Sequence, residues 1–345
     1  MESYFPKALW FKEWREHRWR AVLAAVIISL SPVARGLLYW SRHTAVPGAQ
    51  NYAGRMFWNQ FNSEISTFSK SSTTGLPAVV VVVIIAIILV VGERNSGSLW
   101  YILSTPVQRR QWLRTKFLFG LGVIYGTYTI LLIWNSVVTV FNPAPVGFGD
   151  VVRWWIYMLA VQGTVYAVAF VTALCVTNAI LVFIGTFVVL GIPSFLSGYI
   201  HEATIASSQP VHVAVQRSTQ WIDSLSPLAM FKHNLLLSNP FLYLYMVMIP
   251  LLYVLAQVLM RRIEAEHLSS LLTLPKLWYL VIVGISTGLG SIFATVEMAL
   301  LSRAFGHSFY PLFVPLSVLS AGVIGLLLFG VIGFRTRRRR KHRMA

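Results

Sequence analysis

Residues that could take part in catalysis are few in this chain, and one grouping of them lies at residues 201–212. His201 and Glu202 open the segment HEATI, which begins like the helix of a zinc protease. That motif requires a histidine at its fifth position, because two histidines one helical turn apart bind the metal from one face. Ile205 occupies this position, so the motif fails. His201, Glu202 and His212 either form a metal site on an exterior loop or are solvated there.

One acidic residue, Glu297, lies well inside an apolar segment. An ionisable group at such a depth in a membrane is costly, which makes it a candidate for function. Glu297 either pairs with Arg303 or a basic residue of a neighbouring helix, or it lies at the exterior interface if the span ends early. A membrane-embedded enzyme that uses Glu297 with His307 or His201 is therefore one hypothesis.

Other chemistry has little support in the sequence. The phosphate loop G-x-x-x-x-G-K-[ST] does not occur, so the chain cannot bind ATP by that device. The one cysteine, Cys175, excludes an intramolecular disulfide and a cysteine-based metal cluster, and its apolar surroundings favour a packing role. The remaining acids occupy loops and helix ends, which leaves no ladder of carboxylates for a proton relay. We expect no cofactor, no metal and no catalytic residue in this chain.

The composition is that of an integral membrane protein. Hydrophobic residues make up 56% of the 345 residues and charged residues 11%, against about 45–50% and 25% in soluble domains. So few charges cannot cover the surface of a soluble domain. The formal net charge is +17, but the basic residues gather at the ends of apolar runs, where they set membrane topology. We therefore expect no nucleic-acid partner.

Long apolar runs predict an all-α integral membrane protein with about eight transmembrane helices. A helix needs about 20 mostly apolar residues to cross the hydrocarbon core, and the lack of water there requires even runs rich in Val and Ile to be helical. The expected spans are 21–40, 76–92, 114–140, 153–175, 179–198, 241–260, 277–301 and 311–334. Only the residues VTN separate the fourth span from the fifth, which predicts a tight helical hairpin.

The basic residues also predict that both termini are cytoplasmic. With the two ends on one side, that side holds 20 of the 28 Lys and Arg residues, as the positive-inside rule requires. The chain is then a multi-pass protein of the plasma membrane, with exterior loops at 41–75 and 199–240. Residues 1–20 mix Trp with charge, which predicts an interfacial helix along the cytoplasmic surface. The tail RTRRRRKHR attracts anionic lipid after the last span.

Residues 93–116, between the second and third expected spans, predict a short helix at the membrane exit. Glu93 marks the water boundary, Gly97 permits a bend, and SLWYILST supplies about two helical turns that Pro106 ends. The chain then restarts with basic residues that we expect at the level of the lipid phosphates: Arg109, Arg110, Arg114 and Lys116. The short helix would expose several apolar residues that need lipid or another protein as cover: Leu99, Trp100, Tyr101 and Leu103.

At these residues the chain resembles the permeases of ABC-2-type ABC transporters. In that family the second span is followed by an acidic residue, a turn and a short apolar helix. A Thr-Pro dipeptide and an Arg come next, and a Lys begins the third span. The matching residues are Glu93, Gly97, Leu99, Leu103, Thr105, Pro106, Arg109 and Lys116. Ser98 stands where Thr is common, and Trp100–Tyr101 where Glu–Leu often occurs. The resemblance covers roughly residues 1–260, including a weak sPl element in SPLAMF.

The resemblance implies a coupling helix within loop 93–113, with Trp100 among its partner-binding residues, docked in a groove of a separate ATPase. It also implies an interfacial helix at 1–20 and a six-span permease core at 21–260. Residues 261–345 depart from the common six-span pattern by adding two spans and the basic tail. ATP and Mg²⁺ would be bound by the cytoplasmic ABC ATPase dimer alone, so the chain itself would be no enzyme. A second permease, identical or homologous, would complete the transporter.

The function that follows is export of a hydrophobic or amphipathic cargo, such as a peptide, an antibiotic or a lipid. This cargo class rests on the lack of a charged translocation pathway in the sequence. The alternative is an accessory or sensor membrane protein that docks a cytoplasmic partner other than an ATPase through residues 93–110. Membrane lipids are partners in either case.

Overall fold

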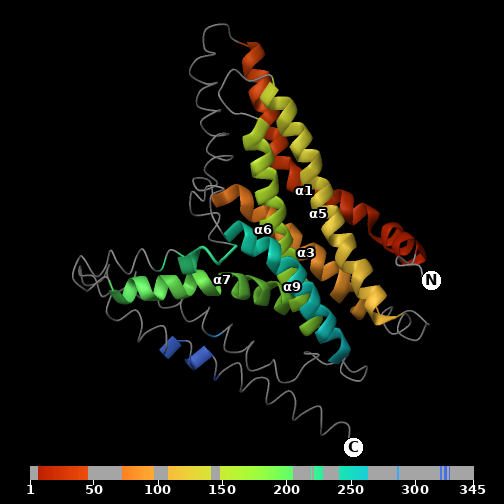
Figure 1. Ribbon diagram of the computed structural model, residues 1–345, viewed down its shortest axis with the longest axis vertical. Coiled ribbons are helices and arrows are strands. Elements are labelled where there is room, and N and C mark those ends of the chain that lie inside the picture. The colour runs from red at the N-terminus through yellow and green to blue at the C-terminus, as the bar shows by residue number, and fades with distance from the viewer. Residues whose placement is uncertain are drawn as a thin grey trace, which may run out of the picture. The chain divides into compact units, whose positions relative to one another are not determined.

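Almost all the secondary structure that can be described is helical, and no described residue lies in a strand. The computed structural model describes residues 7–45, 72–96, 108–140, 148–204, 219, 221–227, 241–262, 286, 319–320, 322–324 and 326. Its helices are α1 Lys7–Ala45, α3 Ser72–Asn95, α5 Arg109–Val140, α6 Phe148–Cys175, α7 Ala179–Thr204 and α9 Phe241–Arg262 (Figure 1). The all-helical prediction therefore holds over the described part of the chain.

Five helices within the described residues are long and apolar enough to cross a membrane. They are Pro77–Asn95, Arg109–Val140, Val151–Cys175, Ala179–Gly198 and Leu242–Arg261. Five of the predicted spans are thus confirmed as helices of membrane length, including the run of Val and Ile in α3. The predicted span 21–40 falls inside helix α1. The predicted spans 277–301 and 311–334 lie outside the described residues, apart from isolated positions.

Several helices extend beyond the apolar runs from which they were predicted. Helix α1 is continuous from Lys7, so the predicted interfacial segment and the first span belong to one helix. Helix α5 begins at Arg109 rather than at 114, and α7 continues to Thr204 rather than ending at 198. Backbone hydrogen bonds form as readily in polar as in apolar sequence, so the apolar run marks only the part of a helix suited to hydrocarbon. The predicted exterior loops 41–75 and 199–240 therefore begin or end in helix.

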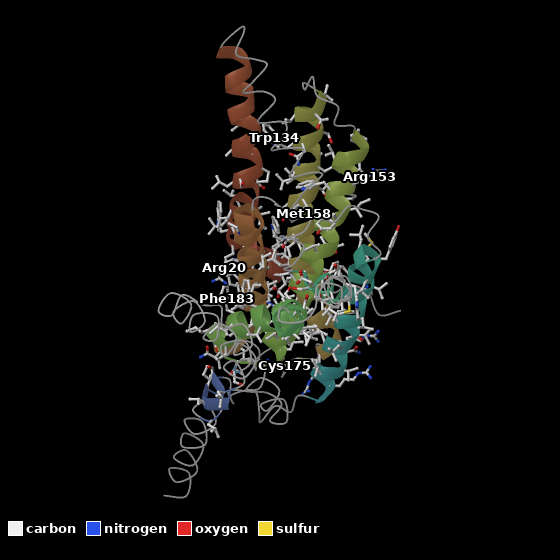
Figure 2. All side chains as sticks on the ribbon, turned by 90° about the vertical axis from the view of Figure 1, so that its left-hand side faces the viewer. Arg20, Trp134, Arg153, Met158, Cys175 and Phe183 are labelled. Carbon is white, nitrogen blue, oxygen red and sulfur yellow. The ribbon has the colours of Figure 1, made fainter. Side chains whose placement is uncertain are left out.

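The chain divides into two compact units, of which the first comprises Met1–Phe183 and Met230–Thr273. In this unit α6 packs against α3, α5 and α9, while α1 packs against α5 and α3. Residues 161–170 of α6 are all buried, so the core of the unit follows this helix. Figure 2 places Arg153 near the start of α6, Met158 further along it and Cys175 at its end. Cys175 is buried there.

The first turns of α1 direct aromatic side chains outward and two ionisable side chains inward. Trp10, Phe11, Trp14 and Trp19 are exposed. Glu13 and His17 are buried, and their spacing of four residues places them on one face of the helix. Exposed Trp is typical of a helix at a membrane interface. The buried carboxylate requires a partner inside the protein.

The connection between α6 and α7 has the length that the sequence predicts. Helix α6 ends at Cys175 and α7 begins at Ala179. The side-chain oxygen of Asn178 accepts hydrogen bonds from the backbone N–H groups of Ile180 and Leu181, at 2.9 and 3.3 Å. This is N-capping, which satisfies donors that have no partner within the helix. Asn178 thus starts α7.

The second unit comprises Ile184–Ala229 and Leu274–Ala345. Its described part is most of α7, a short segment that follows it, and isolated positions between 286 and 326. The hydroxyl of Ser197 donates to the carbonyl of Thr219 at 3.1 Å, and that of Ser226 donates to the carbonyl of Leu190 at 2.6 Å. Ser226 is the first residue of SPLAMF and is fully buried. The segment is therefore bonded to α7 at two points.

Candidate functional site

A cluster of buried charged side chains lies where α1, α3 and α5 meet in the first unit. Helix α1 contributes Glu13 and Lys12, α3 contributes Glu93, and α5 contributes Lys116 and Trp112. The side chain of Lys116 is 0% exposed, that of Glu13 2% and that of Glu93 5%. Fully buried Lys and Glu are rare unless they are paired. We call these five residues the ion cluster.

Lys116 links the three helices through its ammonium group. Its Nζ lies 2.7 Å from Oε2 of Glu13 and 2.7 Å from Oε1 of Glu93. Lys12 Nζ donates to the same Oε1 of Glu93 at 2.9 Å, and Trp112 Nε1 donates to Oε2 at 2.9 Å. Both oxygens of Glu93 are therefore occupied. Two carboxylates and two ammonium groups balance in charge.

Helical spacing explains why these residues converge. Trp112 and Lys116 lie four residues apart at the start of α5, on the same face, so both reach Glu93. Glu93 is near the C-terminal end of α3, and Arg94 follows it. Arg94 donates to the carbonyls of Leu174 and Val176 at 3.3 and 3.5 Å, which satisfies the C-terminal end of α6. The last turn of α3 is thus bonded to three other helices.

The backbone of Lys116 is held as firmly as its side chain. The hydroxyl of Tyr166 in α6 donates to the Lys116 carbonyl at 3.1 Å. Gly120 lies one turn further along α5, and a Cβ atom there would collide with the hydroxyl and ring of Tyr166. The absence of a side chain at Gly120 therefore lets α5 and α6 approach closely enough for this hydrogen bond.

Burial and charge shift the titration of the α1 residues in the ion cluster. Burial raises the pKa of Glu13, although the nearby Lys116 ammonium opposes this shift. For Lys12 burial lowers the pKa, but the hydrogen bond and the charge of Glu93 outweigh it, so the pKa is raised. Lys12 also lies 3.7 Å from Glu16. Lys12 therefore keeps its positive charge at neutral pH.

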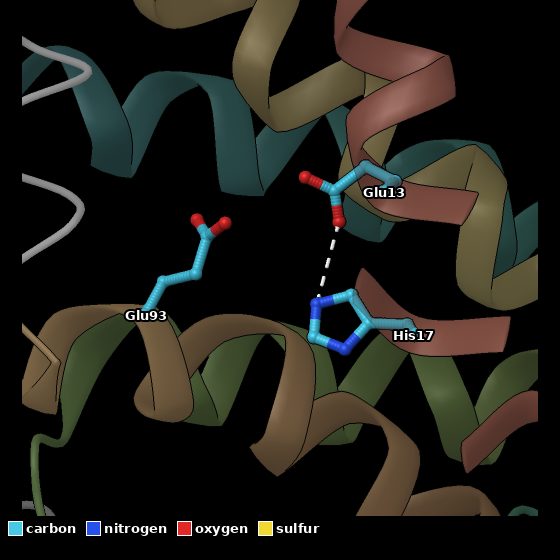
Figure 3. A group of neighbouring side chains, drawn as sticks. All are labelled: Glu13, His17 and Glu93. Atoms are coloured by element: carbon cyan, nitrogen blue, oxygen red, sulfur yellow. Dashed lines mark ion pairs between the residues drawn. The ribbon is translucent and has the colours of Figure 1, made fainter. Parts of the chain in front are cut away.

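His17 borders the ion cluster but is neutral. Burial, the charge of Lys116 and that of Arg20 lower its pKa to about 4. Its Nε2 approaches Oε2 of Glu13 to 3.6 Å, the contact drawn in Figure 3, which is no ion pair while the ring is uncharged. Arg20 Nη1 lies 3.4 Å from His17 Nδ1 and must donate to it. The ring proton is therefore on Nε2, facing Glu13.

Glu13, His17 and Glu93 are also placed as metal ligands would be. Their ligand atoms all lie within 4.8 Å of one another, and Figure 3 shows the three side chains directed toward one region. The ammonium of Lys116 lies between the two carboxylates, 2.7 Å from each. A metal ion would have to displace it against the attraction of both. The arrangement fits an internal cation better than a metal.

Most of the predicted site residues fall where no side chain is described. Gly97, Leu99, Trp100, Leu103, Thr105, Pro106 and Glu297 lie outside the described residues. Arg109 is exposed at the first position of α5. Glu93, predicted at the water boundary, is buried in the ion cluster. Lys116, predicted at the level of the lipid phosphates, is fully buried because two carboxylates neutralise it.

The ion cluster itself was not predicted. Glu93 and Lys116 were each identified as positions of a motif, but Glu13 and Trp112 were not identified at all. One signal was available: Glu13 is an acid in a segment otherwise rich in Trp and basic residues. Another was that Trp112 and Lys116 have the spacing of neighbours on a helix.

The segment GISTG at 284–288 matches the nucleophile-elbow pattern G-x-S-x-G. An elbow requires a turn from strand to helix, whereas Ser286 is helical and buried. Residues 201–204, with His201 and Glu202, belong to the last turn of α7, while His212 lies outside the described residues.

A scan against protein-family models, a search of curated proteins and a search of solved structures each found no match.

Proposed function

We propose that this chain is the transmembrane permease subunit of an ABC exporter. Residues 97–107 would form the coupling element that docks on a cytoplasmic ATPase. The observation that carries the proposal is the ion cluster, which binds both flanks of this segment into one structure. Glu93 lies four residues before Gly97, and Trp112 and Lys116 follow shortly after the segment.

A coupling element must transmit force, so its two flanks have to move together. Trp112 and Lys116 both bond to Glu93, so the beginning of α5 cannot separate from the end of α3 without breaking two buried hydrogen bonds. Lys116 and Lys12 extend the connection to α1. Removing one partner of a buried ion pair typically costs 3–5 kcal/mol. A push on residues 97–107 would therefore move α1, α3 and α5 as one body.

The sequence of the segment supplies the docking surface. Leu99, Trp100 and Leu103 are apolar residues between two membrane-length helices, in a stretch that also carries Pro106. Apolar and aromatic side chains grouped in this way are typical of the centre of a protein interface. The chain has no phosphate loop of its own. A partner subunit that binds ATP and Mg²⁺ would complete the transporter.

In the proposed mechanism two permeases pair, and a dimer of ATPases binds their coupling elements. ATP binding closes the dimer, and this closure moves the helices as rigid bodies and opens a path to the exterior. Both termini and the coupling element lie on the cytoplasmic side of the plasma membrane. The cargo is hydrophobic or amphipathic, because the sequence indicates no charged translocation pathway.

Co-purification of the full chain from its native membranes tests the proposal. We expect an ATP-binding subunit and ATPase activity to be recovered with it. Trp100→Asp should weaken this association by about tenfold or more, the cost of losing an interface anchor. Trp221→Asp is the matched control, because Trp221 is exposed in the segment predicted to be exterior.

Two outcomes would overturn the proposal. A chain that is always isolated alone, without ATPase activity, has no role as a permease subunit. Recovery of a partner that binds no nucleotide, lost on Trp100→Asp, would establish the accessory or sensor function instead.

A further inference from the structure

A cavity of about 340 Å³ lies between α5 and α9 in the first unit. Its lining combines two arginines, Arg110 and Arg114, with apolar side chains that include Phe117 and Tyr253. Among the described residues that line it, none is acidic. The cavity is separate from the ion cluster, with which it shares no residue.

The lining changes from charged to apolar along α5. Arg110 is exposed, Arg114 is half-buried and Phe117 is buried. From Arg110 to Phe117 the helix advances roughly 10 Å, since each residue adds about 1.5 Å. The ring of Phe117 lies 4.9 Å from that of Tyr253 on α9, so the apolar levels of the two helices coincide. Gln257 lies one turn after Tyr253 and adds a polar group to the wall.

These features correspond to the parts of one ligand. Arg110 and Arg114 lie four residues apart on one helix face, and guanidinium groups bind phosphate through paired hydrogen bonds. The apolar wall suits an acyl chain. A soluble phosphate would leave that wall uncovered, and a zwitterionic headgroup would bring a cation toward two arginines. Both helices are long enough to span a membrane, and α5 begins one residue before Arg110, at the expected level of lipid headgroups.

We propose that the α5–α9 cavity binds one anionic phospholipid from the leaflet in which α5 begins. Its phosphate lies on Arg110 and Arg114, and part of one acyl chain lies against Phe117 and Tyr253. The site is next to the segment that connects α3 to α5, so an occupying lipid would support the first turns of α5. This inference does not rest on the proposed transport function.

Native mass spectrometry of the purified full chain in detergent tests the site. Dioleoylphosphatidylglycerol and dioleoylphosphatidylcholine differ in headgroup charge and share their acyl chains. We expect one phosphatidylglycerol to be retained in clear preference to phosphatidylcholine. Arg110→Gln with Arg114→Gln should weaken its binding about 30-fold, at roughly 1 kcal/mol for each basic residue near a membrane surface. Arg15→Gln with Arg18→Gln removes the same charge from exposed positions of α1 and should change binding less than twofold.

A second pair of variants tests the apolar part of the site with all charges kept. Leu118 also lines the cavity, and Leu118→Trp should fill it and reduce retention of phosphatidylglycerol. Ile130→Trp, at an exposed position of the same helix away from the cavity, should not. Equal retention of the two lipids, or equal losses from the two arginine pairs, would overturn the proposal. So would competition by inorganic phosphate, or a second copy of the chain found to cover the cavity.

Discussion

At the scale of single residues, Lys116 is the charged side chain with the least exposure among the described residues. Its ammonium is fully buried and bonds to carboxylates from two other helices. Desolvation of an ammonium costs several kcal/mol, so this arrangement is tolerable only with both carboxylates in place. Glu13 and Glu93 depend on Lys116 in the same way, because without it they would lie close together as like charges. Each of α1, α3 and α5 therefore carries a buried charge that side chains of the other two helices neutralise.

Replacing Lys116 by Met should lower the free energy of unfolding by about 3–5 kcal/mol, because it leaves two carboxylates in a buried site with only Lys12 as cation. The measurement is equilibrium unfolding of the purified chain in detergent. Adding Glu13→Gln to Lys116→Met should restore part of the loss, since one buried negative charge is removed. Arg15→Met, at an exposed position of α1, is the control. An unchanged free energy in Lys116→Met would show that the ion cluster is dispensable.

His17 makes the stability of the folded protein depend on pH. In the unfolded chain its pKa is near 6.5, and in the folded protein burial, Lys116 and Arg20 lower it to about 4. Between these values the unfolded chain binds a proton that the folded protein does not. Stability from neutral His17 is therefore complete above about pH 6.5 and is lost as the pH falls toward 4. Glu13 acts oppositely, because its raised pKa favours the folded state as the pH falls.

The contribution of His17 can be isolated with His17→Gln, which keeps a polar side chain and does not titrate. We expect the unfolding free energy of the unmodified chain to fall more steeply than that of His17→Gln between pH 6.5 and 4. The two pH profiles should differ by the binding of one proton, that of His17, because Glu13 contributes similarly to the pH dependence of both proteins. Unfolding curves recorded at several pH values measure this difference. Parallel pH profiles would mean that His17 titrates normally in the folded protein.

At the scale of the helices, glycine residues determine how closely neighbouring helices approach one another. Gly120 on α5 faces Tyr166 on α6, and Gly163 on α6 faces Tyr125 and Ile249. A Cβ at Gly163 would lie 2.6 Å from the Tyr125 hydroxyl and 2.7 Å from Cδ1 of Ile249. Small residues allow membrane helices to approach and gain van der Waals contact, which lipid does not otherwise favour. The contacts among α5, α6 and α9 depend on these two positions.

Gly120→Ala should destabilise the protein by about 1–3 kcal/mol, the usual cost of overpacking a tight core. Tyr166 cannot move aside without losing its hydrogen bond to the Lys116 carbonyl. Gly122→Ala on the same helix is a matched control, because nothing lies within 4 Å of its Cβ. For Gly122→Ala we expect the free energy of unfolding to rise by up to about 1 kcal/mol, since Ala has a higher helix propensity than Gly. Thermal unfolding in detergent distinguishes the two, and equal effects would contradict the close approach.

At the scale of the whole molecule, the ion cluster and the α5–α9 cavity both belong to the first compact unit. Helix α5 takes part in each, with Lys116 directed to the ion cluster and Arg114 lining the cavity. The proposed coupling segment leads directly into this helix. An ATPase bound there and a lipid bound at the cavity would thus act on the same helix, which makes α5 the element that connects the two proposals.

Much of the fold could be predicted because it depends on local sequence. An apolar run of some 20 residues must be helical to enter hydrocarbon, so the run of Val and Ile in α3 could be assigned correctly. The connection at Asn178 was also predictable, since a single polar residue caps the helix that follows it. Helix ends were predicted less well. Hydrogen bonding continues past the apolar run, as it does from Arg109 in α5 and to Thr204 in α7.

The candidate site could be predicted only in part. The sequence by itself determined that Glu93 and Lys116 lie near the facing ends of two consecutive membrane-length helices. The tertiary structure alone decided that both face inward, toward Glu13, which precedes Lys116 by 103 residues. Pairing at this separation depends on which helix faces are buried together. Close packing of glycine and aromatic side chains, such as Gly120 against Tyr166, decides this, and no local pattern in the chain encodes it.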